Sequence, residues 1–164
     1  MESNVSVSPN TLVVAMGAIG VAQNNGSLRT LLGSCLGLVL YERRLKIGGL
    51  VHIVLPKAPE GRCETPGKFV DTAVPALIRK MEERAGGATL KLCAKLAGGA
   101  NMFQTTATYT IGEQNIAAME QLLQELRIPV IGRHLGGEQG RRMTLDTATG
   151  TVTIDVVGAE TITL

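Results

Sequence analysis

Residues 36–55 read LGLVLYERRLKIGGLVHIVL, two apolar runs on either side of a short charged segment. The runs Leu36–Tyr41 and Ile47–Leu55 are nearly continuous in apolar character, which is typical of strands covered on both faces. The charged residues 42–44 predict a turn between the two runs, and Pro56 predicts the end of the second. The sequence therefore predicts two strands that other layers of the domain cover on both sides.

Helices and further strands are predicted around this pair. Apolar residues at helical spacing predict two helices, Phe69–Arg84 and Glu113–Leu126. The first contains Pro75, which we expect near the first turn or at a kink, and Gly112 is expected to precede the second. Strands are predicted at 11–16, 28–32, 90–96 and 128–131, with a hairpin formed by 143–145 and 151–157. The pattern predicts one mixed α/β domain over residues 11–164, after a flexible N-terminus at residues 1–10.

The composition excludes several classes of function. The 164 residues are 45% hydrophobic, which is typical of one folded domain with a substantial core. The net charge is only +2 and no block of like charge occurs, which argues against nucleic acid or an anionic membrane as partner. No apolar run approaches the roughly 20 residues of a membrane span, and no signal peptide is evident. We expect a cytoplasmic protein with no membrane insertion.

The three cysteines cannot all pair, and none has C-x-x-C spacing. Cys63 lies in a segment rich in Pro and Gly, and Cys93 in an apolar run. Neither has a familiar zinc-ligand spacing with a histidine, so no metal site is predicted. Reduced thiols are the expected state.

A cysteine and a histidine in the central segment could form a nucleophile and its base. Cys35 follows Gly33 and Ser34 in a glycine turn, and His52 lies on the strand that comes next but one. A free cysteine thiol has a pKa of about 8.5 and is mostly protonated at neutral pH. A neighbouring imidazole would activate the thiol by lowering that pKa or by accepting its proton. Backbone N–H groups of the turn could stabilise a developing oxyanion. The alternative is that neither residue is catalytic and that a buried structural cysteine lies beside a structural histidine.

Several short motifs, in one order along almost the whole chain after residue 10, resemble those of the CheD family of chemoreceptor glutamine deamidases. These motifs are TLLGSC at 30–35, KIGG at 46–49, HIVLP at 52–56, PGKFVDTAV at 66–74, AGGANMF at 97–103, IGEQN at 111–115, GG at 136–137 and GR at 140–141. Their order makes the resemblance more specific than any single motif.

The resemblance implies hydrolysis of glutamine side-chain amides on methyl-accepting chemotaxis receptors, giving glutamate and ammonia during adaptation. It implies Cys35 as the nucleophile and His52 as the base. Family members also use a threonine just before the Gly-Ser-Cys segment to order the histidine. Thr30 is the nearest threonine here, although in a register shifted by one residue Arg29 would fall at that position.

The resemblance further implies a layered α/β sandwich with two main helices, no cofactor, and binding of a CheC-like phosphatase of CheY close to the active site. Gly98 and Gly99 would border that partner surface, with Phe103 as a contact. Without a downstream Lys-Ser or Lys-Thr, the Gly98-Gly99 pair does not form a phosphate-binding loop and otherwise predicts a tight turn. Arg141-Arg142 could meet acidic receptor helices or be ordinary surface arginines.

Two other functions are consistent with the same residues. The domain could be a non-catalytic regulatory module that binds a CheC-like phosphatase or chemoreceptors. It could instead be a thiol amidase or peptidase with another substrate. Reactivity of the Cys35 thiol near neutral pH would distinguish either enzyme from the binding module.

Overall fold

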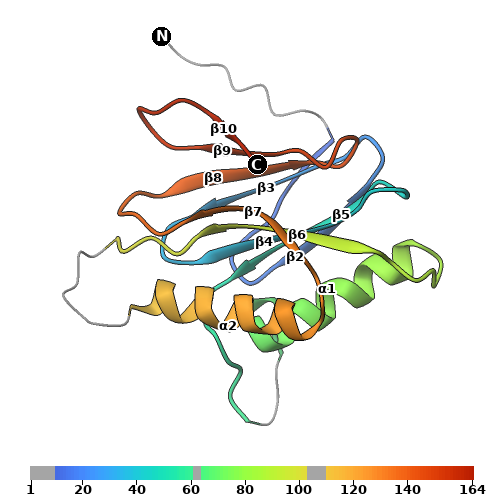
Figure 1. Ribbon diagram of the computed structural model, residues 1–164, viewed down its shortest axis with the longest axis horizontal. Coiled ribbons are helices and arrows are strands. Elements are labelled where there is room, and N and C mark those ends of the chain that lie inside the picture. Colours follow the sequence, from blue (N-terminus) through green and yellow to red (C-terminus); the bar gives the residue numbers. More distant parts are fainter. Residues whose placement is uncertain (1–9, 61–63, 103–109) are drawn as a thin grey trace.

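The computed structural model describes residues 10–60, 64–102 and 110–164, which form three layers: two five-stranded sheets and a pair of helices (Figure 1). One sheet has the order β1-β3-β8-β9-β10 and the other the order β2-β5-β4-β6-β7. Both helices cover the second sheet, on the side facing away from the first. This confirms the expected α/β sandwich of mixed sheet with two main helices.

The inner sheet lies between the outer sheet and the helices. Its strands are β2 (Ile19–Gln23), β4 (Leu36–Glu42), β5 (Ile47–Ile53), β6 (Leu92–Gly98) and β7 (Val130–Leu135). Every residue of β4 and β5 is buried, because α1 (Val70–Arg84) and α2 (Ile111–Glu125) cover one face and the outer sheet covers the other. The prediction of two doubly covered strands is therefore confirmed.

The outer sheet is antiparallel except at one edge. It contains β1 (Thr11–Val13), β3 (Ser27–Leu32), β8 (Arg141–Asp146), β9 (Val152–Asp155) and β10 (Ile162–Thr163), and β1 pairs with β3 in parallel. A short 3-10 helix, η1 (Pro66–Lys68), leads into α1. The buried residues Leu28, Thr30 and Leu32 alternate along β3, which shows that this strand directs one side towards the inner sheet.

Alternation along β4 separates two hydrophobic cores. Leu36, Leu38 and Leu40 pack with the helices, whereas Val39 and Tyr41 pack between the sheets. The core between the sheets also contains Cys35. The nucleophile expected from the sequence is therefore directed between the two sheets and away from the helices.

Several element boundaries differ from the predictions. The strand expected at 11–16 ends at Val13, and β2 and β10, which were not predicted, are short. Residues 97 and 98 belong to β6 and not to a loop. Pro75 is the sixth residue of α1, beyond the first turn, so its missing N–H leaves the Asp71 carbonyl without a helical donor.

Gly112 lies inside α2 and does not precede it. The helix begins with a capping box in which Thr110 and Glu113 exchange side-chain and backbone hydrogen bonds. A Cβ at Gly112 would stand 2.6 Å from the carbonyl oxygen of Gly99. The glycine is therefore required for close packing of the helix on the end of β6, which a prediction from propensity does not take into account.

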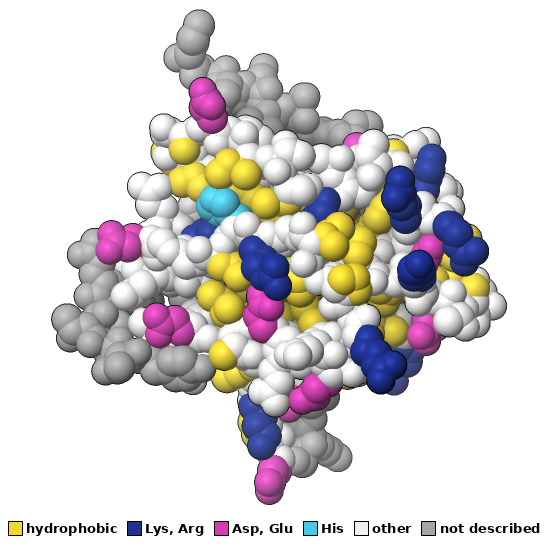
Figure 2. Space-filling model, viewed as in Figure 1, with side chains coloured by type: hydrophobic (Ala, Val, Ile, Leu, Met, Phe, Trp, Pro, Cys, Tyr) yellow, Lys and Arg dark blue, Asp and Glu magenta, His cyan; other side chains and the backbone are white. Residues whose placement is uncertain are grey.

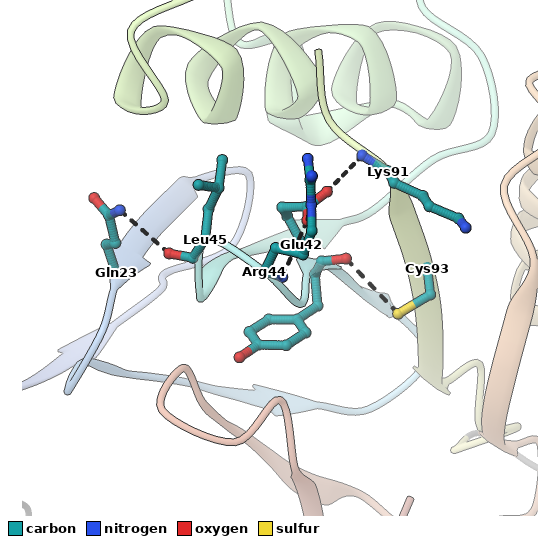
Figure 3. A network of polar contacts seen from close by, with 7 residues as sticks. Gln23, Glu42, Arg44, Leu45, Lys91 and Cys93 are labelled. Carbon is teal, nitrogen blue, oxygen red and sulfur yellow. Dashed lines mark hydrogen bonds and ion pairs between the residues drawn. The ribbon is translucent and has the colours of Figure 1, made fainter. Parts of the chain in front are cut away.

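A polar network joins β4 and β6 at the end of β4 opposite Cys35 (Figure 3). The buried Glu42 carboxylate accepts hydrogen bonds from the backbone N–H groups of Arg44, at 3.1 Å, and Lys91. Beside it, the Cys93 thiol donates to the Tyr41 carbonyl at 3.7 Å. At about 3.3 Å per residue, β4 separates this network from Cys35 by roughly 20 Å. It stabilises the strand ends and is not part of the candidate site.

The surface agrees with the small net charge. On the face shown in Figure 2, acidic and basic side chains are interspersed with apolar ones. Among the described residues, no helix is long and apolar enough to cross a membrane.

Candidate active site

The candidate active site lies where the chain passes between the two sheets, towards the left of Figure 1. Residues 33–35 lead from β3 in the outer sheet to β4 in the inner sheet, and residues 136–140 lead back from β7 to β8. The end of β6 lies between these crossings: the Gly99 N–H donates to the Cys35 carbonyl at 2.9 Å, and the Asn101 N–H donates to the Gly137 carbonyl at 2.8 Å. Three segments far apart in sequence therefore meet around Cys35.

A hydrogen bond across the sandwich joins Thr30 to His52. Thr30 lies on the inward side of β3, and its Oγ1 is 2.7 Å from Nδ1 of His52 on β5. The same hydroxyl donates to the Val14 carbonyl at 2.7 Å. Both side chains are almost fully buried, with Thr30 1% and His52 5% exposed. Thr30, and not Arg29, is thus the residue that contacts the histidine.

This pair of contacts determines the tautomer of His52. A threonine hydroxyl carries one proton, and here that proton is donated to Val14. The Nδ1 atom must then carry a proton and donate it to Thr30, which leaves Nε2 with a free lone pair. Nε2 is buried and has no hydrogen-bond partner among the described residues. The ring is therefore held in the form that can accept a proton at Nε2.

Strand register directs Cys35 towards the same space as His52. His52 is paired with Gly37, which lies two residues after Cys35 and on the same side of the chain. If the β4–β5 pairing is extended by one residue, Cys35 becomes the diagonal neighbour of His52. The Cβ atoms of diagonal neighbours are roughly 7–8 Å apart or less. Both residues lie on the side of the inner sheet that faces Thr30. The structure thus brings together Cys35, His52 and Thr30.

Burial leaves both reactive groups uncharged near neutral pH. It raises the pKa of the Cys35 thiol, which is 8% exposed, above its ordinary value. Burial also lowers the pKa of the His52 imidazole. A preformed thiolate–imidazolium pair, one of the two activated states considered from the sequence, is therefore disfavoured in the free protein. The arrangement suits an imidazole that accepts the thiol proton as the thiol attacks.

The turn that carries Cys35 is held by the end of β6. The Ala100 N–H donates to the Gly33 carbonyl at 3.1 Å, alongside the bond from Gly99 to Cys35. Gly98 has a φ of +106°, and a Cβ there would overlap the carbonyl oxygen of Cys35. Gly98 and Gly99 are both buried. The prediction that they border a partner surface stays a prediction. Their contact with the Cys35 turn was not expected from the sequence.

The remaining residues considered from the sequence have other positions. Phe103 and Cys63 lie outside the described residues. Cys93 belongs to the network around Glu42, and His134 contacts Arg141. Among the described residues, no three His, Cys, Asp or Glu side chains gather as a metal-ligand group would.

Arg141 is only 5% exposed and donates to backbone carbonyls, so it is unavailable to the acidic receptor helices considered from the sequence. Arg142 is half-buried and pairs with Asp155 at 3.3 Å.

The sequence reasoning missed two parts of the site. The Val14 carbonyl completes the Thr30–His52 arrangement, but a backbone acceptor has no sequence signature. An open groove of about 970 Å³ adjoins Gly33 and is lined by Leu31, Met102, Val157 and residues 138–142, among others. Its residues come from four separate segments, so no local pattern marks it.

Comparison with known proteins gives one consistent result. The family described as "CheD chemotactic sensory transduction" matches residues 54–156, a range that begins just after His52. A protein from Methanococcus vannielii is 45% identical over 144 residues, which cover 87% of this chain and 93% of that protein. A protein from Methanococcus maripaludis strain C6 is 42% identical over 87% of this chain and 93% of its own length. A protein from Clostridium botulinum strain Alaska E43 is also 42% identical, over 88% of this chain and 92% of its own length. All three are named "Probable chemoreceptor glutamine deamidase CheD".

Proposed function

The chain belongs to the CheD family, and from this premise we propose that it is a chemoreceptor glutamine deamidase with Cys35 as its nucleophile. The enzyme hydrolyses the side-chain amide of receptor glutamines to glutamate and ammonia. The observation that carries the assignment of residues is the Thr30–His52 hydrogen bond, because it leaves the buried Nε2 free to act as a base.

The reaction begins with attack of the Cys35 sulfur on the carboxamide carbon of the glutamine. As the S–C bond forms, Nε2 of His52 takes the thiol proton, so the thiol need not ionise in advance. The carbonyl oxygen of the substrate becomes an oxyanion. We assign the Ser34 N–H as one donor to it: the Gly33 carbonyl of the same peptide bonds to Ala100, so this N–H points the opposite way. One such donor contributes about 3 kcal/mol.

Collapse of the tetrahedral intermediate breaks the C–N bond. His52 returns its proton to the departing nitrogen, and ammonia leaves because the nitrogen is no longer a poor leaving group. The product at this stage is a thioester between Cys35 and the receptor. A water molecule then gives a proton to His52 as its oxygen attacks the thioester carbon. The C–S bond breaks, His52 returns the proton to the sulfur, and the receptor leaves with a glutamate side chain in place of the glutamine. The same groups could hydrolyse a methyl ester, since only the leaving group differs.

The partners and the location follow from the same proposal. Chemoreceptors are the substrate, as the names of the relatives state for those proteins. A CheC-like phosphatase remains a proposed partner near the Cys35 turn, and a purely regulatory module that binds it is the alternative function. Cys35 and Cys93 are free thiols, which is consistent with our assignment of the enzyme to the cytoplasm.

The test is mass spectrometry of a chemoreceptor signalling fragment after incubation with the protein. We expect glutamine residues to gain about one mass unit with the wild type and not with Cys35→Ala. The matched control is Cys93→Ala, because that thiol lies in the network around Glu42 and should be dispensable. Conversion that persists in Cys35→Ala would contradict the assigned nucleophile. Absence of conversion by the wild type, with binding to the fragment intact, would favour the regulatory module.

A further inference from the structure

Arg141 is a buried arginine whose hydrogen bonds converge on one loop. It is the first residue of β8 and is paired with Leu32 on β3, so it points between the sheets. Its Nη1 donates to the His134 carbonyl at 2.6 Å and lies 2.8 Å from His134 Nδ1. Its Nη2 donates to the carbonyls of Gly136 and, at 3.3 Å, Gln139. Among the described residues, no carboxylate lies within ion-pair distance of it.

Without an acidic partner, the two terminal nitrogens of the buried guanidinium donate to three carbonyl groups within residues 134–139, while its buried Nε has no partner among the described residues. Burial of a charge costs free energy unless several hydrogen bonds offset it, so these carbonyls and Arg141 must be ordered together. Gly136 and Gly137 have φ values of +80° and +74°, in a segment that would otherwise be free to adopt many conformations. The planar fork of an arginine can bridge such dispersed acceptors, which a lysine ammonium cannot do in the same way.

The ordered loop forms one wall of the groove beside the Cys35 turn. Residues 138–140 line this groove together with Gly33 and Met102. The loop is attached to the end of β6, because the Gly136 N–H donates to the Gly98 carbonyl at 2.9 Å and the Gly137 carbonyl accepts from Asn101. The groove adjoins the Cys35 turn at Gly33 and has walls from both crossings, whereas Cys35 and His52 are not among its lining residues. Its position beside the turn suits a protein segment that carries the reacting glutamine.

We propose that Arg141 is a positioning residue that holds residues 136–140 as a wall of the substrate groove and thereby sets the affinity for the receptor segment. This inference rests on the proposed deamidase function. Arg141 acts on binding more than on chemistry, because its hydrogen bonds go to residues 134–139 and none goes to the Cys35 turn, which Gly99 and Ala100 contact directly. Loss of the fork should therefore raise KM for a protein substrate and leave the nucleophile itself unchanged.

The experiment compares the wild type with Arg141→Lys, which keeps the charge but loses the fork, and with Arg141→Met. The probe is the chemoreceptor fragment, and deamidation rates at varied fragment concentration give KM and kcat separately. Leaving buried carbonyls without donors weakens such sites enough that we expect KM to rise about tenfold or more, with kcat changing less than threefold. Alkylation of Cys35 by iodoacetamide, a small reagent that needs no groove wall, should proceed at the wild-type rate.

The matched control is Arg133→Lys, because Arg133 forms a comparable two-pronged contact, with Glu120, on the surface at 2.6 and 2.9 Å. It should leave KM unchanged. A folded Arg141→Lys with wild-type KM would overturn the inference, as would a fall in kcat and in Cys35 alkylation at constant KM. If Arg141→Met does not fold, Arg141→Lys alone decides. Failure of the wild type to deamidate the fragment would instead refute the underlying function.

Discussion

At the scale of single residues, the Thr30 hydroxyl connects the fold to the chemistry. It donates to Val14 and accepts from His52, so one side chain fixes both the position and the tautomer of the proposed base. The sequence alone left two candidates, because the resemblance allowed either Thr30 or Arg29. The alternation of Leu28, Thr30 and Leu32 puts Thr30 on the buried side of the strand and was a usable signal. Contact with His52, however, depends on the packing of two sheets, which spacing cannot give.

Replacing Thr30 should reduce catalysis more than it reduces folding. Thr30→Val keeps the shape but leaves the Nδ1 proton of His52 and the Val14 carbonyl without a partner, at a cost of about 1–3 kcal/mol. We expect kcat for deamidation to fall by roughly 10- to 100-fold, since the ring loses its fixed tautomer. Thr30→Ser, which retains the hydroxyl, should recover most of the activity. Equal losses in the two variants would mean that the hydroxyl has no role in orienting His52.

The pH dependence should reflect a neutral histidine. Burial lowers the pKa of His52, so less than half of the imidazole is protonated at pH 6.5, the ordinary histidine pKa being about 6.5. Activity that requires a free Nε2 should therefore decline with falling pH about a midpoint that lies below 6.5. The measurement is kcat/KM for a receptor fragment across pH 4.5–8, restricted to conditions in which the protein remains folded. A midpoint at or above pH 6.5 would show instead that a protonated His52 is favoured in the free enzyme.

At the scale of elements, the end of β6 acts as a support for the nucleophile turn. Gly98 has a backbone conformation that side chains rarely adopt, and its α-carbon faces the Cys35 carbonyl. Gly98→Ala should displace this turn and reduce kcat at least tenfold, because small errors in nucleophile position are costly. Gly86→Ala is the matched control: Gly86 also has a positive φ, of +68°, but nothing lies within 4 Å of its Cβ position.

The two variants separate local backbone strain from contact with the site. Both should lose roughly 1 kcal/mol or more of stability from the positive φ, and Gly98→Ala should lose more because its Cβ would also overlap the Cys35 carbonyl oxygen. Only Gly98→Ala should lose deamidation activity and show altered alkylation of Cys35. Normal activity in a folded Gly98→Ala would mean that the turn does not depend on this support.

The elements that the sequence predicted well are those with strong local patterns. β4 and β5 are apolar on both sides, and α1 and α2 have apolar residues at helical spacing, so their existence followed directly. β2 was missed because Ile19–Gln23 contains Gly20 and Gln23 and lacks a clear alternation. Residues 97–98 looked like a glycine loop, but they pair with β4 and β7. Pairing partners overrode local preference in this case.

At the scale of the whole molecule, the site belongs to neither sheet alone. Cys35 immediately precedes β4 of the inner sheet, His52 lies in that sheet, and Thr30 lies in the outer one. The sequence could single out Cys35 and His52 as candidates, because their residue types are rare in this chain and chemically distinctive. It could not reveal the groove or the hydrogen bonds from Arg141 to residues 134–139, because both depend on how the chain returns from β7 to β8.

The order of strands in the outer sheet has a consequence for the newly made chain. On the ribosome the N-terminal residues emerge first, so the hairpin of β4 and β5 can pair early and bring Cys35 beside His52. β3 gains its antiparallel neighbour only when β8 emerges, after all strands of the inner sheet have been made. Until then Thr30 lacks the sheet that holds it over His52, and the thiol lacks its cover. We therefore expect the nascent chain to expose Cys35 beside a histidine that is not yet oriented, and to gain activity only when β8 is in place.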